Sequence, residues 1–282
     1  MSDMTCAVSV AFRPGYAELP GLLDLWATIR RDAAAAVAQD RLMAHPINDM
    51  LLRHDGFAEA LACRLARKLA DDELDAATLA VLIGETYEDD PAIVAAAAAD
   101  LLAIRDRDPA CADLLTPFLY FKGFLALQAY RISHYLWQRG RQHLARHMQS
   151  RCSEVFGADI HPAARLGRGI LVDHGTGLVI GETAVVDDDV SMLQEVTLGG
   201  TGKDSGDRHP KIRRGVLLGA GAKVLGNIVV GEGAKVGAGS VVLASVAPYT
   251  TVVGVPAHPV GPRNTGMAAL TMDQMMPADR QG

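Results

Sequence analysis

Cysteine is scarce in this sequence, and the few cysteines are widely spaced. Cys6, Cys63, Cys111 and Cys152 form no CxxC pair. That spacing argues against a disulfide framework and against a structural zinc site, and it predicts a reduced, cytoplasmic location. The N-terminal residues carry no basic segment followed by a sustained apolar run, so we expect no secretory signal.

Long apolar runs and basic excess are missing as well. The most apolar long stretch, Pro117–Trp137, is interrupted by Lys122, Gln128 and Arg131, and no stretch approaches the roughly 20 apolar residues that a membrane span needs. The formal net charge is −6, with 16 Lys/Arg against 22 Asp/Glu in residues 1–159 and 11 of each after them. Binding to a phosphate backbone needs a basic excess, so we expect neither nucleic acid nor membrane as a partner.

Glycine is rare in the first half of the chain and abundant in the second. Only 6 of the 28 glycines precede Gly157. The first half shows helical periodicity, with Asp90-Pro91 as an N-cap followed by proline at the first helical position. We therefore predict a helical domain over residues 1–156, with 1–18 poorly ordered, a second domain over 157–262, and a flexible tail over 263–282.

The second half repeats every six residues. Thirteen aliphatic residues keep this spacing within three runs: Ile160, Leu166, Val172; Ile180, Val186, Met192, Leu198; Ile212, Leu218, Val224, Val230, Val236, Val242. Hexads of this kind predict a parallel β-helix, because each unit supplies one short strand and one corner and can bury its apolar side chain only when coils stack. The fold class is thus an all-α domain followed by a β-helix.

The repeat breaks phase in two places. From Val172 to Ile180 the step is eight residues, and from Leu198 to Ile212 it is fourteen. The second break is polar and rich in glycine, which predicts one extended loop over 199–211, and such loops commonly serve binding. Residues capable of chemistry therefore gather where the repeat fails.

The first break holds Asp173-His174, and the second holds Arg208-His209. Imidazole is the side chain best suited to take a proton from an alcohol near neutral pH, and Asp159 on the preceding coil is a candidate to orient it. The guanidinium of Arg208 has the planar fork that suits a carboxylate. A surface histidine and a solvated charged loop are the alternative interpretations of these two motifs.

Three further residues have ordinary structural explanations. Arg107-Asp108-Pro109 is typical of a turn that ends a helix, because the residue before proline avoids the helical region. Lys223 and Lys235 each follow a Gly-Ala pair at a predicted corner. We expect both lysines to be solvated, although either position suits a phosphate.

Together, six motifs resemble the long, two-domain form of bacterial serine O-acetyltransferase, a member of the hexapeptide-repeat acyltransferase superfamily. The resemblance runs from about Trp26 to Val260. It is carried by these segments: Arg105-Asp-Arg-Asp-Pro109, Tyr120-Phe-Lys-Gly-Phe-Leu-Ala-Leu-Gln-Ala-Tyr-Arg131, Asp159-Ile-His-Pro-Ala163, Asp173-His-Gly-Thr-Gly177, Gly199-Gly-Thr-Gly-Lys203 and Asp207-Arg-His-Pro-Lys-Ile212.

The resemblance implies an enzyme that moves the acetyl group of acetyl-CoA to the hydroxyl of L-serine, the first step of cysteine biosynthesis from serine, on a left-handed β-helix. It implies that His174 is the general base and that Asp159 orients it. The serine pocket would use Asp108 and Asp173 for the ammonium, and Arg208 and His209 for the carboxylate.

The family also implies partners. Acetyl-CoA is a co-substrate and no cofactor is permanently bound; it would lie between neighbouring β-helices at Ala220, Ala238 and Lys235. Family members form hexamers, as two trimers, and L-cysteine inhibits them from the serine pocket. In the family a C-terminal isoleucine anchors cysteine synthase; here the sequence ends at Gly282, so we expect no tight complex.

Three alternatives remain open at this stage. The same scaffold could acetylate homoserine or another hydroxylated acceptor such as an amino sugar. A zinc-dependent carbonic anhydrase would need three converging histidines, for which His161, His174, His209 and His258 are available. A non-catalytic scaffold is disfavoured by the two phase breaks, because it has no need of them.

Overall fold

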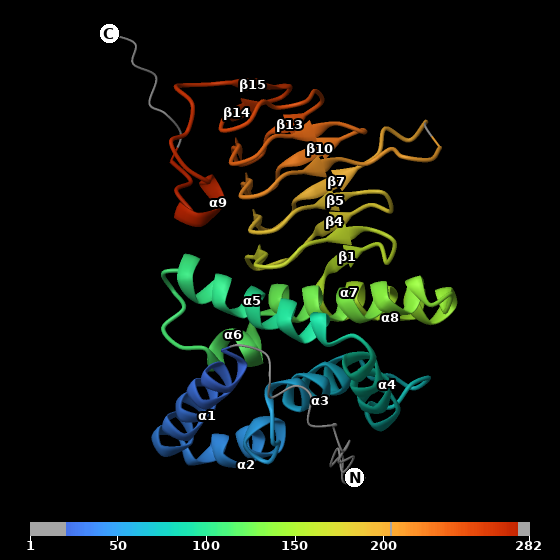
Figure 1. Cartoon of the computed structure of the whole chain (residues 1–282), viewed down its shortest axis with the longest axis vertical. Helices are drawn as coiled ribbons and strands as arrows, with labels where there is room; N and C mark the ends of the chain where they lie inside the picture. The colour runs from blue at the N-terminus through green and yellow to red at the C-terminus, as the bar shows by residue number, and fades with distance from the viewer. Residues whose placement is uncertain (1–20, 204, 276–282) are drawn as a thin grey trace.

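The computed structural model describes residues 21–203 and 205–275. Helices occupy one end of the molecule, and a stack of β-coils rises from them (Figure 1). Residues 1–18, predicted to be poorly ordered, and Pro277–Gly282, on which the cysteine synthase prediction depends, lie outside the described residues.

The helical half extends from Leu22 to Phe156. Its elements are α1 (Leu22–Gln39), η2 (Arg41–Met43), α2 (Ala44–Ile47), η3 (Asn48–Leu52), α3 (Phe57–Leu69), α4 (Ala76–Asp89), α5 (Pro91–Arg107), α6 (Leu115–Tyr120), α7 (Lys122–Gln138) and α8 (Gln142–Phe156). The start of α5 confirms the predicted cap, since Pro91 is its first residue and the Asp90 side chain accepts a hydrogen bond from the Ala92 amide.

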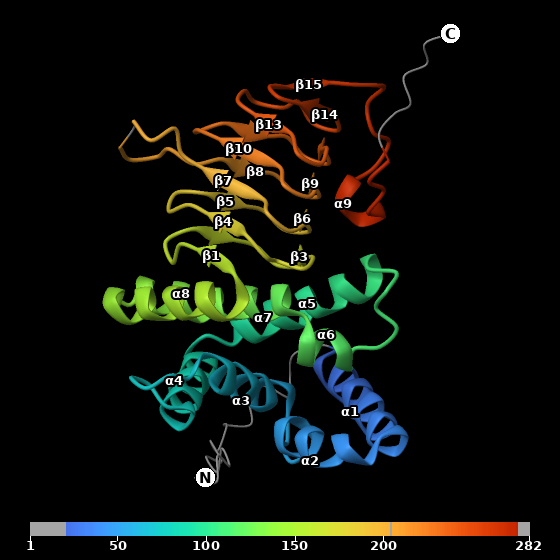
Figure 2. The same cartoon turned by 180° about the vertical axis from the view of Figure 1, so that it is seen from behind.

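Helices α5, α7 and α8 form the layer directly against the β-coils (Figures 1 and 2). Most of α7 is buried, including Phe124, Leu127 and Ile132. Its apolar character therefore reflects a position between the two halves of the molecule. No helix in the described part of the chain is long and apolar enough to cross a membrane.

The second half is a parallel β-helix with three faces, which we name A, B and C. Face A contains β1 (Ala158–Ile160), β4 (Leu178–Ile180), β7 (Thr197–Gly199), β10 (Lys223–Leu225) and β13 (Val241–Val242). Face B contains β2 (Arg165–Leu166), β5 (Val185–Val186), β8 (Lys211–Ile212) and β11 (Val229–Val230). Face C contains β3 (Leu171–Val172), β6 (Ser191–Met192), β9 (Leu217–Leu218), β12 (Lys235–Val236), β14 (Thr251–Gly254) and the antiparallel β15 (Ala257–Pro259).

The register confirms the hexad prediction. On face A, Ile180 pairs with Ile160 on one side and Leu198 on the other, and Val224 pairs with both Leu198 and Val242. The other eight predicted aliphatics pair in the same way on faces B and C. Twelve of the thirteen are buried and Leu166 is half-buried, so each coil places its branched side chain inside the stack.

Three edges join the faces, and they decide where the polar residues lie. The chain passes from face A to B at the AB edge, from B to C at the BC edge, and from C back to A at the CA edge. The first phase break, around His174, lies at the CA edge between β3 and β4. The second break leaves the stack at the AB edge between β7 and β8, where Figure 1 shows the loop projecting.

Part of the predicted tail packs against the β-helix. Within residues 263–275 the short helix α9 (Ala268–Thr271) lies beside face C (Figure 2). Ala269 is fully buried, and Ala268 joins an apolar cluster with Leu193 and Leu217. This segment therefore has packed structure of its own on face C.

Candidate active site

His174 lies in an exposed turn at the CA edge. Its backbone has φ 56°, a left-handed conformation that a non-glycine residue adopts rarely and that often marks a functional turn. Its side chain is 71% exposed, and Nε2 lies 3.7 Å from Oδ1 of Asp173. The ring is thus open to a substrate, with a carboxylate beside it.

Asp108 lies near enough to Asp173 for its charge to act on that carboxylate, although the two are far apart in the sequence. Asp108 follows the last residue of α5, and α5 packs against β3, which ends just before Asp173. Burial raises the pKa of Asp173, and the neighbouring charge of Asp108 raises it further, while His174 lowers it. Two carboxylates that repel each other form a site that a cation such as an ammonium would stabilise.

Arg208 and His209 lie at the AB edge, held by the preceding coil. The Thr183 hydroxyl accepts hydrogen bonds from both backbone amides, at 3.0 and 3.1 Å, and lies 2.9 Å from Nδ1 of His209. Arg208 Nη2 donates to Oε2 of Glu182 at 2.6 Å, and this bond holds the pKa of Glu182 below its usual value. Burial lowers the pKa of His209, and the Arg208 charge lowers it further.

Asp159 does not contact His174 within this chain. Its Oδ1 accepts a hydrogen bond of 2.6 Å from Nε2 of Gln149. Asp159 lies in β1 on face A, one residue before that strand ends at the AB edge. The predicted orienting role of Asp159 stays a prediction.

The predicted acetyl-CoA residues divide between an edge and a covered face. Ala220 and Ala238 lie at the CA edge, in line with His174, where the Ala220 carbonyl accepts from the Gly239 amide at 2.7 Å. Lys235 is only 5% exposed, so its expected solvation is wrong. Its Nζ donates to the carbonyls of Asp273 and Met275, at 3.0 and 2.6 Å, because the packed segment lies over it.

One group in residues 21–203 and 205–275 brings three potential metal ligands within 4.8 Å of one another: Asp71, Glu73 and His147. It lies in the helical half. The imidazole faces Asp71 with Nε2, at 3.5 Å, and Glu73 with Nδ1, at 3.4 Å. The four histidines of the carbonic anhydrase alternative form no such group in these same residues.

Sequence reasoning missed Gly181, Glu182 and Thr183, which support the second half of the site. They occupy the AB edge one coil before the loop, and a Cβ on Gly181 would overlap the His209 ring. Counting hexads places these three residues beside Arg208 and His209, so their position could have been predicted from the repeat.

Comparison with known proteins agrees with this architecture. Residues 25–129 match the family described as "Serine acetyltransferase, N-terminal", and residues 209–244 match "Bacterial transferase hexapeptide (six repeats)". A serine acetyltransferase of Salmonella typhimurium is 53% identical over 250 residues, which are 89% of this chain and 92% of that protein.

Solved structures extend the likeness to the whole fold. A serine acetyltransferase in complex with cysteine has 49% identity and a TM-score of 0.89, over 90% of this chain and 99% of that one. The enzyme of Brucella abortus in complex with coenzyme A has 48% identity and a TM-score of 0.84, over 86% and 97% of the two chains. A soybean enzyme complexed with serine has 49% identity and a TM-score of 0.84, over 86% and 100%. The chain therefore belongs to the serine acetyltransferase family, whose members are acyltransferase enzymes.

Proposed function

We propose that the chain transfers the acetyl group of acetyl-CoA to the hydroxyl of L-serine, giving O-acetyl-L-serine and CoA, with His174 as the general base. The observation that carries this proposal is the position of His174. It is an open imidazole at the CA edge, beside an acidic pair and in line with the corners of Ala220 and Ala238.

The chemistry needs no covalent enzyme intermediate. His174 takes the proton from the serine hydroxyl as its oxygen attacks the thioester carbonyl. The tetrahedral intermediate collapses by breaking the carbon–sulfur bond, and the CoA sulfur leaves with the proton that His174 returns. A positioned base of this kind typically raises the rate about 10²- to 10⁴-fold. Binding the two substrates side by side raises the rate further, because it orients the reacting groups.

Asp108 and Asp173 suit the ammonium of serine. Burial raises the pKa of Asp173, and the charge of Asp108 raises it further; a cation between the two carboxylates would relieve their repulsion. Arg208 and His209 suit the serine carboxylate. Arg208 is already bound to Glu182, so a carboxylate must share or replace that partner.

These two groups lie at different edges, which supports an active site built from two copies of the chain. The intervening strand β4 has three residues and so spans about 10 Å, whereas the amino and carboxylate groups of serine share one carbon. A threefold assembly with face A towards the axis would bring the AB edge of one copy to the CA edge of the next. Val179 on face A and Leu243 beside it are exposed apolar residues that such contacts would cover.

The hexamer, in which helical halves join two such trimers, is the arrangement that we propose from the family resemblance. Within it Asp159 of one copy would approach His174 of its neighbour, because Asp159 lies on face A next to the AB edge. The complex of a relative with cysteine supports L-cysteine as an inhibitor that competes for the serine pocket.

Acetyl-CoA is proposed to lie along the CA edge at Ala220 and Ala238, and the complex of a relative with coenzyme A supports this class of ligand. A contact between Lys235 and the co-substrate requires the segment at Asp273 and Met275 to move. A cytoplasmic location is consistent with the free thiols of Cys111 and Cys152. The absence of a tight cysteine synthase complex stays a prediction for calorimetry.

Thiol release from acetyl-CoA tests the function, with serine, homoserine and amino sugars as acceptors. We expect serine to be preferred, and His174→Ala to lower kcat at least about 100-fold while acetyl-CoA still binds. His258→Ala is the matched control, because His258 is also exposed but lies on β15. Near-normal turnover by folded His174→Ala would contradict the assignment of the base.

A further inference from the structure

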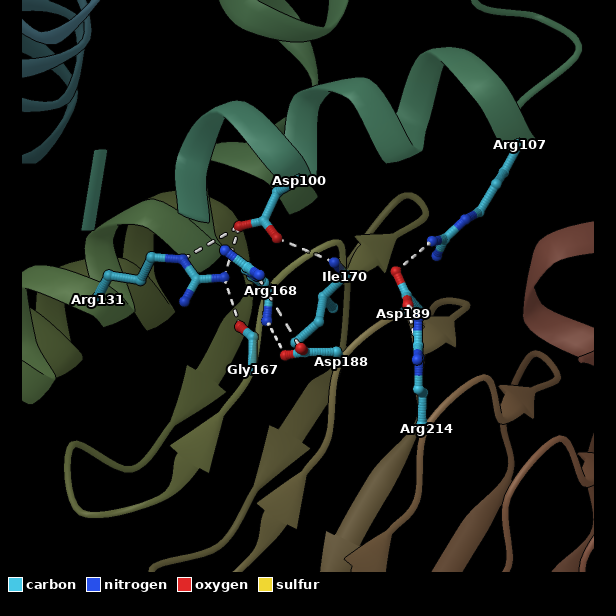
Figure 3. A network of polar contacts seen from close by, with 9 residues as sticks. All are labelled: Asp100, Arg107, Arg131, Gly167, Arg168, Ile170, Asp188, Asp189 and Arg214. Atoms are coloured by element: carbon cyan, nitrogen blue, oxygen red, sulfur yellow. Dashed lines mark hydrogen bonds and ion pairs between the residues drawn. The ribbon is translucent and has the colours of Figure 1, made fainter. Parts of the chain in front are cut away.

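The C-terminal end of α5 is fastened to the β-helix by a buried guanidinium. Arg107, the last residue of α5, has a side chain only 6% exposed, and its Nη2 lies 3.3 Å from Oδ1 of Asp189 (Figure 3). Its Nη1 donates to the Ser191 hydroxyl at 3.3 Å, and that hydroxyl donates to the carbonyl of Ala269 in α9 at 3.1 Å. Asp189 and Ser191 belong to the second coil, so Arg107 ties the end of α5 to that coil.

Asp189 is shaped to hold two cations. It lies at the BC edge with φ 61°, a left-handed conformation that aspartate and asparagine tolerate better than most residues. Its second oxygen, Oδ2, accepts from Nε and Nη2 of Arg214, at 2.9 and 2.7 Å. Burial lowers the pKa of Arg107, and the Asp189 carboxylate opposes that effect. The pair therefore keeps a desolvated cation compensated at the end of the helix.

A second tether fixes the same helix further back. Asp100 lies two turns before Arg107, about 10 Å along the axis, and its Oδ1 accepts from the Ile170 amide at 2.9 Å. Two tethers fix both the position and the direction of α5. The residue that follows, Asp108, has an extended backbone, and its Oδ1 accepts from the Ala110 amide at 2.8 Å. The location of the Asp108 carboxylate thus depends on where α5 ends.

We infer that Arg107 and Asp189 are positioning residues, which hold Asp108 beside Asp173 and thereby set the affinity for the ammonium group of the acceptor. This inference rests on the proposed function, because it assigns Asp108 and Asp173 to the acceptor ammonium. Neither Arg107 nor Asp189 touches the acceptor. Their effect passes through the end of α5, and it should appear in the affinity for serine and not in that for acetyl-CoA.

Asp189→Asn is the sharpest perturbation. Asparagine keeps the size of the side chain and tolerates φ 61°, but it removes the charge that compensates Arg107. Because misplacing a group by about 1 Å can cost up to about 100-fold, we expect the KM for serine to rise about tenfold, with kcat within about twofold and the KM for acetyl-CoA unchanged. Arg107→Lys keeps the charge but loses the planar fork whose two nitrogens reach Ser191 and Asp189, so it should give a smaller rise.

Two matched controls separate this role from general loss of charge. Arg214 is the other partner of Asp189, and the Arg214 side chain is 59% exposed. Arg214→Gln removes this partner and leaves Arg107 paired with Asp189. Arg105→Gln removes an exposed pair with Asp106 on the same turn of α5. Neither variant should change the KM for serine, and melting temperatures of all variants would show that they are folded.

A double-mutant cycle decides whether the effect passes through Asp108. Asp108→Asn alone should weaken serine binding, and adding Asp189→Asn to it should then have little further effect, because the group being positioned is already gone. Additive losses, an equal rise in both KM values, or an unchanged KM in Asp189→Asn and Arg107→Lys would each overturn the inference. Serine turnover by the unmodified chain is measured first, so a failure of the proposed function is seen separately.

Discussion

The buried ion pair of Asp100 in α5 with Arg131 in α7 allows a direct test of how the two halves of the molecule are held together. Asp100 is fully buried, and its carboxylate accepts four hydrogen bonds: from Nε and Nη2 of Arg131 at 3.1 and 2.6 Å, from Gln128 at 3.1 Å and from the Ile170 amide at 2.9 Å. Arg131 is 7% exposed and also donates to the Gly167 carbonyl at 2.8 Å. Figure 3 shows Asp100 and Arg131 with Gly167 and Ile170 of the first coil.

Asp100→Ala removes the acceptor and leaves Arg131 as a buried charge with a single remaining hydrogen bond. Breaking a buried pair in this way costs about 3–5 kcal/mol in the free energy of unfolding, and the unsatisfied Ile170 amide contributes within that range. With an m value near 3 kcal/mol/M, the urea midpoint should fall by about 1 to 1.7 M. Fluorescence of Trp137, which packs edge-on against His161 at 5.2 Å between the two halves, reports the transition.

Replacing both charges tests the reason for the loss. In Asp100→Asn with Arg131→Met, the asparagine oxygen can still accept from Ile170, and its amide can donate to the Gln128 oxygen, which has no partner among the described atoms. Because no charge remains buried, this double variant should be more stable than Asp100→Ala. The exposed pair of Arg139 with Asp89 is the control, and Arg139→Ala should cost at most about 1 kcal/mol. A loss below about 1 kcal/mol in Asp100→Ala, or a double variant no more stable than it, would refute the reasoning.

Four other changes test the site and its assembly. Arg208→Lys keeps the charge but loses the planar fork, so the KM for serine should rise at least about tenfold with that for acetyl-CoA unchanged, and an equal rise in both would contradict the carboxylate role. Gly181→Ala should show the same selectivity, because its methyl group displaces the His209 ring, and unaltered kinetics would place His209 outside the pocket. Because the pKa of His209 is lowered in the folded chain, the stability linked to it is fully present above the unfolded-state pKa of 6.5 and is lost as the pH falls below that value. His209→Gln should therefore reduce the drop in melting temperature between about pH 7.5 and about pH 5.5. An undiminished drop would show that other groups cause it. A fragment beginning at about Cys152 should be a trimer by light scattering if face A forms the contact, and a monomer would refute that arrangement.

The sequence predicted the β-helix in detail because the relevant signal is local. Each hexad states which of its side chains enters the stack, and the pairing of Ile180 with Ile160 and Leu198 follows from counting coils. The cap of α5 at Asp90 and Pro91 was readable for the same reason, since the residues that make it are neighbours in the chain. The phase breaks likewise mark His174 and Arg208, because a departure from the six-residue step is visible in the order of residues alone.

Only the tertiary structure decided which of these residues lie near one another. Asp108 lies near enough to Asp173 to affect its pKa because α5 packs against β3 of the first coil, and the bond between Arg107 and Asp189 joins residues 82 positions apart. Neither contact can be predicted from the periodicity of the sequence, because the periodicity reports only on neighbouring residues. Lys235 was misjudged for this reason: the preceding Gly-Ala pair predicts a solvated corner, whereas Lys235 lies in β12 and its Nζ is bound by carbonyls 38 and 40 residues further along the chain. Local sequence patterns therefore determined the β-helix and identified the candidate reactive groups. The packing of distant segments determined how close those groups lie and which of them are exposed to water.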